Sequence, residues 1–281
     1  YILKWLEADK ESDKPFFVYA AYTAPHDPSH APKKYIDKYK GTYDGGFDVL
    51  RNARYQQLKK LGLIAENANQ FPWNGVKWED LSEEAQQIAA RKMEVYAAMI
   101  DYMDNQISRI FDWLEKSGEM DNTLVVFISD NGANGGLLEN YPGQTEEYMS
   151  TFDNSLENMG QQNSLIDMGP NWASASMAPF RLFKGFTTEG GIKAPCIIKL
   201  PKGTKSNKSM INSFAHISDL VPTFLDLAQI SHPSVENKKI PPMMGKSMMP
   251  LLSGEANDIH LTEGVGYELH GSKAYFKDEW K

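Results

Sequence analysis

The segment that most constrains the fold is a short apolar run that stops at a polar turn. Leu124 to Ile128 are five consecutive apolar residues, and Ser129-Asp130-Asn131-Gly132 follows them directly. A short apolar run between turn residues is typical of a strand buried on both faces, as in a parallel sheet. Open α/β sheets bind their ligands at the carboxyl ends of such strands. We therefore expect an α/β fold with its chemistry at the end of this strand.

Asp130 and Asn131 form a candidate metal site. A carboxylate beside a carboxamide offers two hard oxygen ligands, which suit Ca²⁺ or Mg²⁺. The same residues also fit an Asx turn that closes a strand, with Gly132 supplying a positive φ. The local sequence leaves both interpretations open.

A second apolar run leads to a candidate histidine. Residues 15–22, PFFVYAAY, predict another buried strand, and TAPHDP follows it. His26 lies between Pro25 and Pro28, and each proline restricts the residue before it. A histidine held in this way is a candidate site residue, and an ordinary surface-loop histidine is the alternative.

Lys184 is a candidate anion ligand in the second half of the chain. It lies between Phe183 and Gly185, in a Gly- and Thr-rich piece that precedes a predicted strand within 192–200. A lysine there could act as a point charge for an anion, and a surface lysine is the alternative. Residues 132–178, before it, have no clear periodicity, and a loop of that length is usually functional, such as a lid or substrate wall.

The strongest helix signal begins at Ser82, which is a good N-cap followed by two glutamates. Apolar residues then recur at helical spacing from Ile88 to Leu114 and predict one sustained apolar face. Further helices are expected at 31–39 and 48–61, and strand-like structure at 267–276. The long helix, a short loop and the Leu124 strand would form the αβ half of a βαβ unit.

Composition excludes some functions. The net charge of −8 argues against a nucleic-acid or anionic-membrane surface. No apolar run approaches the ~20 residues that span a bilayer. Cys196 is the one cysteine, so no intrachain disulfide can form. The chain opens and stops within predicted elements, so we expect a fragment whose targeting signals could lie outside it.

The motifs occur in a distinctive order: TAPHDP, a long helix, SDNG, a long loop and KGFTTEGG. This order closely resembles the sulfatase family of the alkaline-phosphatase-like superfamily, and within it the bacterial arylsulfatases. FDNSLENMG and HISDLVPTFLDLA are further matches, and the resemblance covers essentially the whole chain. The fold it implies is α/β, with a mixed, largely parallel central sheet and helices on both faces, truncated here at both ends.

The resemblance also implies roles for four residues. Asp130 and Asn131 match two metal ligands, normally for Ca²⁺. His26 matches a histidine that contacts the sulfate, and Lys184 matches a lysine that bridges sulfate and leaving-group oxygen. Sulfate-ester cleavage builds negative charge on the departing oxygen, which such groups stabilise. The implied substrate is a small-molecule or carbohydrate sulfate ester, and the implied location is periplasmic or secreted.

One departure from the family pattern is important. The family's nucleophile is a formylglycine made from Cys or Ser in a C-x-P-S-R-like motif, and the chain has no such motif. Cys196 is followed by Ile-Ile-Lys and does not match it. We expect the formylglycine and the family's early metal-binding Asp pair upstream of residue 1. Residues 1–255 would then be the C-terminal part of the catalytic domain, and 256–281 the start of a small, incomplete sheet subdomain.

Two other functions stay open on the sequence. A phosphodiesterase or phosphonate monoester hydrolase of the same superfamily would use a metal ion and a nucleophile in the same way. A pseudoenzyme would keep the fold without the nucleophile.

Overall fold

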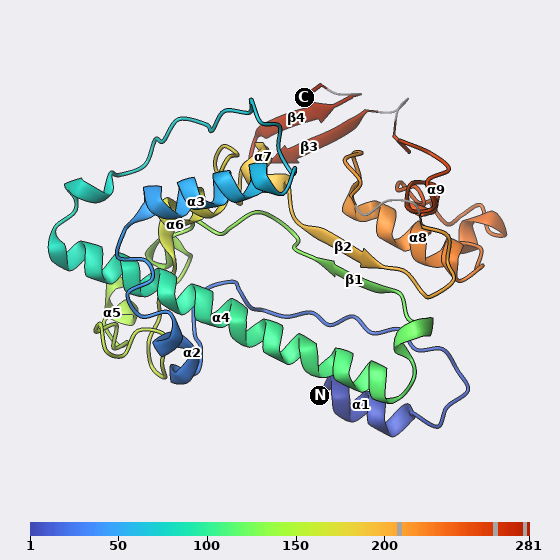
Figure 1. Cartoon of the computed structure of the whole chain (residues 1–281), viewed down its shortest axis with the longest axis horizontal. Coiled ribbons are helices and arrows are strands. Elements are labelled where there is room, and N and C mark those ends of the chain that lie inside the picture. Colours follow the sequence, from blue (N-terminus) through green and yellow to red (C-terminus); the bar gives the residue numbers. More distant parts are fainter. Residues whose placement is uncertain (207–209, 261–263, 278–279) are drawn as a thin grey trace. The chain divides into compact units, whose positions relative to one another are not determined.

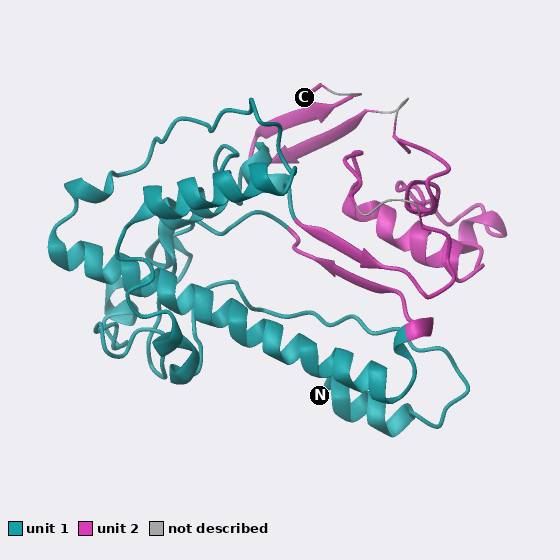
Figure 2. Ribbon diagram, in the orientation of Figure 1, with its two compact units in different colours: residues 1–120, 131–194 teal, residues 121–130, 195–281 magenta. Residues whose placement is uncertain are grey.

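The structure is a computed structural model, and it describes residues 1–206, 210–260, 264–277 and 280–281. The chain divides into two compact units, coloured separately in Figure 2. Unit 1 contains residues 1–120 and 131–194, and unit 2 contains residues 121–130 and 195–281.

Unit 1 is helical (Figure 1). Its α-helices are α1 (Ile2–Asp9), α2 (Lys33–Lys38), α3 (Phe47–Lys60), α4 (Glu83–Lys116), α5 (Glu146–Met149), α6 (Gly169–Ser176) and α7 (Glu189–Ile192). Short 3₁₀ turns lie at Trp78–Asp80 and Leu138–Asn140. The helices predicted at 31–39 and 48–61 are confirmed as α2 and α3. α6 was missed, because its eight residues, GPNWASAS, contain one large apolar side chain, Trp172, and so carry little apolar periodicity.

α4 begins where its N-cap predicts. The Ser82 hydroxyl accepts a hydrogen bond from the Ala85 amide at 3.2 Å, which satisfies one of the free amides of the first turn. The predicted single apolar face is only partly correct. The helix is buried nearly all round between Met93 and Met99, whereas Ile100 is 38% exposed. Neighbouring elements therefore enclose the middle of α4 rather than one stripe of it.

Two apolar clusters pack along α4. One joins α2 and the 159–166 segment to α4 through Ile36, Val95 and Met159. The other is aromatic and packs Phe47 of α3 against Trp172 of α6, with 4.6 Å between ring centroids. The Trp172 indole N–H also donates to the Ala89 carbonyl at 2.8 Å, so this large buried ring has its polar group satisfied.

Unit 2 carries two small sheets. β1 (Val125–Ile128) pairs antiparallel with β2 (Cys196–Lys199), with Val125 opposite Lys199 and Ile128 opposite Cys196. β3 (Val265–Leu269) and β4 (Ser272–Phe276) form a hairpin, as predicted for 267–276. The helices are α8 (Leu220–Leu227) and α9 (Met249–Ser253), with 3₁₀ turns at Ile217–Asp219 and Pro233–Val235. One further 3₁₀ turn, Met120–Asn122, precedes β1.

Two strand predictions need correction. Both sheets formed by the described residues are two-stranded and antiparallel, so the predicted largely parallel central sheet is not observed. Residues 15–22 form no strand, and Phe17 and Tyr19 are 74% and 83% exposed. A strand is defined by a ladder of backbone hydrogen bonds with a neighbouring strand, and residues 15–22 belong to neither of the two sheets that the described residues form. β1 is not buried on both faces either: Val125, Val126 and Ile128 are half-buried, and Phe127 is 38% exposed.

The expected division at residue 255 stays a prediction. Part of the expected subdomain, residues 261–263 and 278–279, lies outside the described residues.

Candidate functional site

His26 and Lys184, 158 residues apart in sequence, meet in unit 1. The Lys184 Nζ lies 2.8 Å from the His26 Nε2. His26 comes from the loop 23–28, and its side chain is 44% exposed. Lys184 comes from the segment that leads into α7. The contact brings together the two residues for which the sequence suggested an anion-binding role.

The hydrogen bonds of His26 define its tautomer. A lysine ammonium has only donors, so Nε2 must be the acceptor in this contact. The other ring nitrogen, Nδ1, lies 2.8 Å from the carbonyl oxygen of Asp27 and therefore carries the proton. Among the described residues no carboxylate lies within ion-pair distance of Lys184, whose ammonium is thus available to an anion that enters beside the ring.

Close backbone contacts hold the two chain segments of the site together. The Lys184 amide donates to the Ala133 carbonyl at 3.0 Å, and the Gly132 amide donates to the Gly191 carbonyl at 2.9 Å. A Cβ on Gly132 would lie 1.8 Å from the Gly190 carbonyl oxygen. Glycine is therefore required at position 132 by close approach to backbone, and not by a positive φ as an Asx turn would have it.

Sequence reasoning missed two residues of this site. The Asp27 side chain is 4% exposed, and its Oδ1 lies 3.1 Å from the His26 Nδ1. The Asn134 side-chain amide donates to the same Oδ1. The signal for Asp27 was its position next to His26. For Asn134, 107 residues away, the sequence gives no signal before the loop is folded.

The predicted metal ligands follow β1, and the boundary between the two units falls between them. Asp130 is exposed, and among the described residues its carboxylate has no ion-pair partner; Asn131 is half-buried. A free carboxylate and an amide oxygen suit a hard cation, so these two residues fit Ca²⁺ in kind. No group of three or more His, Cys, Asp or Glu among the described residues could hold a metal ion. The metal role of Asp130 and Asn131 stays a prediction.

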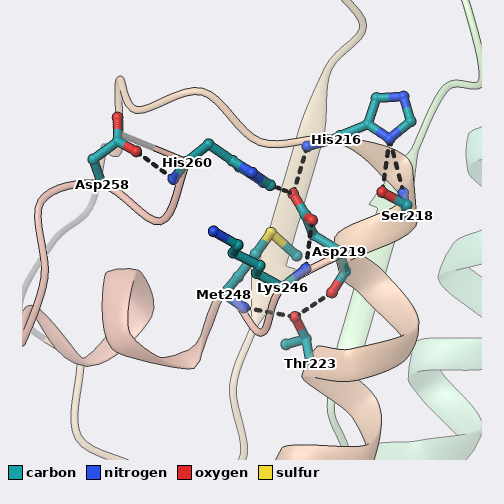
Figure 3. A network of polar contacts seen from close by, with 8 residues as sticks. All are labelled: His216, Ser218, Asp219, Thr223, Lys246, Met248, Asp258 and His260. Carbon is teal, nitrogen blue, oxygen red and sulfur yellow. Dashed lines mark hydrogen bonds and ion pairs between the residues drawn. The ribbon is translucent and has the colours of Figure 1, made fainter. Parts of the chain in front are cut away.

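A second polar cluster lies within unit 2 (Figure 3). The fully buried Asp219 accepts hydrogen bonds from the His216 amide at 2.7 Å, the Lys246 amide at 2.9 Å and the His260 Nε2 at 2.8 Å. Thr223 donates to the Asp219 carbonyl at 2.5 Å and accepts from the Met248 amide at 2.8 Å. Because both carboxylate oxygens are satisfied and the cluster is closed to solvent, we interpret it as a structural clamp.

Comparison with known proteins decides the family. The family model described as Sulfatase matches residues 1–230, most of the chain. The chain belongs to the sulfatase family. The chain is 43% identical over 280 residues to an uncharacterized sulfatase of Schizosaccharomyces pombe, and the match covers 97% of the chain and 50% of that protein. It is 37% identical over 248 residues to an arylsulfatase of Klebsiella aerogenes, covering 87% and 53%.

Solved structures support the same fold. The structure of Ps i-CgsB in complex with k-i-k-neocarrahexaose has a TM-score of 0.55 and 21% identity, and the match covers 97% of this chain and 41% of the other. The phosphonate monoester hydrolase of Silicibacter pomeroyi has a TM-score of 0.50 and 20% identity, with coverage of 91% and 40%. The chain spans about half the length of the curated relatives it matches. None of its described helices has the length and apolarity to cross a membrane.

Proposed function

We propose that the protein hydrolyses sulfate monoesters and that His26 and Lys184 bind the sulfate group. The observation that carries the proposal is the 2.8 Å contact between Lys184 Nζ and His26 Nε2, with no carboxylate within ion-pair distance of that lysine among the residues described. A point charge and an imidazole side by side form a local site for an anion in a chain whose net charge is −8.

The chemistry follows from where charge develops. As the bond between sulfur and the leaving oxygen breaks, negative charge grows on that oxygen. Lys184 would stabilise this charge more strongly in the transition state than in the bound ester, which is the condition for faster chemistry. His26 would hold a sulfate oxygen and fix the orientation of the ester.

Calcium and a formylglycine nucleophile belong to the same proposal. Asp130 and Asn131 would hold Ca²⁺ together with further oxygen ligands, since Ca²⁺ takes six to eight. When bound, the cation would supply positive charge to the sulfate oxygens. No C-x-P-S-R-like motif occurs within residues 1–281, so we place the nucleophile outside them.

Aryl sulfates are the first substrates to test, because the curated relatives include an arylsulfatase. Carbohydrate sulfates are the second, because one similar structure is a complex with k-i-k-neocarrahexaose. The competing function is hydrolysis of phosphonate monoesters, which the similar fold of the Silicibacter pomeroyi enzyme favours.

The deciding experiment compares esters that share a leaving group. The protein is expressed from its complete reading frame, and kcat/KM is measured for an aryl sulfate and for the matching aryl phosphonate monoester. We expect the sulfate to be the better substrate and chelation of divalent cations to lower its rate. A clear preference for the phosphonate would support the competing enzyme, and no turnover of either ester, or of carbohydrate sulfates, would support a pseudoenzyme.

A further inference from the structure

We propose that Asp27 is a positioning residue that orients His26 through its ring Nδ1, and that Asn134 holds Asp27 in place. The role rests on the proposed function where catalysis is concerned, but its structural part can be tested without a substrate. In the sequence only the place of Asp27 next to His26 pointed to this pair, and nothing pointed to Asn134.

Two oxygens of Asp27 face one nitrogen of His26. The carbonyl oxygen lies 2.8 Å and the carboxylate Oδ1 3.1 Å from Nδ1. Both are acceptors, so together they require a proton on Nδ1 and leave Nε2 to face Lys184. Since the ring is 44% exposed, packing alone does not fix its orientation.

The carboxylate is itself held by a chain of hydrogen bonds. The Asn134 Nδ2 donates both to Asp27 Oδ1 and to the Tyr141 hydroxyl, the latter at 2.9 Å. The Asn134 Oδ1 accepts from the Gly136 amide at 3.3 Å. The loop that follows the SDNG motif therefore sets the position of the Asp27 carboxylate, which contacts His26. In this way the SDNG motif and the TAPHDP motif contribute to one site.

The burial of Asp27 indicates what its charge does. Its side chain is 4% exposed, and its Oδ2 has no hydrogen-bond partner within the part of the chain that the structure describes. A buried carboxylate oxygen without a partner is costly unless its charge acts on a neighbouring group. The ring of His26 is an ionisable neighbour of this carboxylate, in contact with its Oδ1. To donate a hydrogen bond to a sulfate oxygen, Nε2 must also carry a proton, and the nearby carboxylate compensates the resulting positive ring.

The first test reads the tautomer of His26 directly. Long-range ¹H–¹⁵N NMR spectra distinguish Nδ1–H from Nε2–H, and a His26→Gln spectrum assigns the signal. At alkaline pH, where an ordinary imidazole is neutral, we expect the wild-type ring to be Nδ1–H. Asp27→Asn keeps the shape and the backbone carbonyl but removes the charge, and Asn134→Ala loosens the carboxylate without removing it. Both should give a measurable share of Nε2–H.

The second test measures catalysis in the protein expressed from its complete reading frame. Partners that orient metal-bound histidines change affinity or activity by roughly 10- to 100-fold when mutated, and we expect Asp27→Asn to lower kcat/KM for an aryl sulfate by a similar factor, mainly through kcat. Asp37→Asn is the matched control, because this exposed α2 carboxylate pairs with Lys33 at 2.6 Å. It should leave both the spectrum and the kinetics unchanged.

The outcomes separate the two proposals. A tautomer shift in Asp27→Asn or Asn134→Ala supports the positioning role even if no sulfate ester is hydrolysed, in which case only the proposed function fails. If folded Asp27→Asn and Asn134→Ala both keep the wild-type spectrum and wild-type kcat/KM, the backbone carbonyl alone orients the ring and the positioning role is wrong. Asn134→Ala gives the answer by itself should Asp27→Asn not fold.

Discussion

The site has no room for a side chain at position 132, which is glycine. Its added Cβ would lie 1.8 Å from the Gly190 carbonyl oxygen, which is backbone and cannot rotate away. We expect Gly132→Ala to lower the free energy of unfolding by about 2 kcal/mol or more, within the range of overpacked sites. Thermal or denaturant unfolding measures this. Gly266→Ala is the control, because among the described residues its Cβ would meet only Tyr275, at 4.0 Å. Equal stability losses in the two variants would contradict the close approach.

Asp219 offers a second test at the residue scale. It is 0% exposed and accepts three hydrogen bonds, one of them from His260. Asp219→Ala leaves those donors without their acceptor, and each buried donor left unsatisfied costs roughly 1–3 kcal/mol. Chemical denaturation should show a loss of that size. Glu236 is exposed, and Glu236→Ala should change the free energy of unfolding by less than about 0.5 kcal/mol. An equal loss of stability in the two variants would show that Asp219 is not a structural clamp.

At the scale of elements, a surface ion pair ties α2 to α4. Lys38 Nζ lies 2.5 Å from Asp101 Oδ2, and the Tyr39 hydroxyl donates to the same oxygen at 3.1 Å. The pKa of Asp101 is lowered chiefly by the hydrogen bond from Lys38, and the hydrogen bond from Tyr39 lowers it further. A carboxyl whose pKa is lower in the folded state stabilises the fold above its unfolded pKa, and that contribution is lost as pH falls through the folded pKa.

Asp101→Asn should therefore lower the melting temperature at neutral pH, and the difference from wild type should shrink in the acid range, below roughly pH 4. Thermal melts across pH measure it. Asp104→Asn, one turn along the same exposed side, is the control and should shift the melt little at any pH. A difference between wild type and Asp101→Asn that stays constant with pH would show that packing, rather than charge, is lost.

The elements show what the sequence can predict. α4 was predictable because its N-cap and its apolar periodicity are local properties of the sequence, and α3 and strand-like structure at 267–276 were expected as well. The partner of β1 was not, because pairing with β2 joins residues more than 60 positions apart. Residues 15–22 have the composition of a strand but belong to neither of the two sheets that the described residues form. His26 and Lys184 were predictable as candidates by resemblance, whereas Asp27 and Asn134 depend on loops that meet only in the folded chain.

At the scale of the whole molecule, the proposed hydrolysis requires a nucleophile, and no C-x-P-S-R-like motif occurs within residues 1–281. We predict that these residues, expressed alone, show no measurable turnover of an aryl sulfate, because binding and electrostatic groups without a nucleophile leave only residual catalysis. The assay follows product release across the elution profile of the purified chain. Turnover well above buffer that coincides with the protein peak would mean that a nucleophile within these residues has been overlooked.

The central claim is that Lys184 stabilises the departing oxygen of a sulfate ester, and replacing this lysine tests it most directly. The measurement is kcat/KM for wild type and Lys184→Ala, in the protein expressed from its complete reading frame, across aryl sulfates of varied leaving-group pKa. Lys193→Ala is the matched control: this exposed lysine of the same segment contacts Glu189 and Phe180 instead. Lys184→Arg tests whether a planar guanidinium can replace the compact ammonium.

We predict that Lys184→Ala loses roughly a hundred-fold or more in kcat/KM, or about 3 kcal/mol, as when one oxyanion donor is removed. The loss should shrink for the most acidic leaving groups, which need least stabilisation. Lys184→Arg should recover only part of the activity, and Lys193→Ala should resemble wild type. A folded Lys184→Ala variant whose kcat/KM matches wild type across the whole series would contradict the claim.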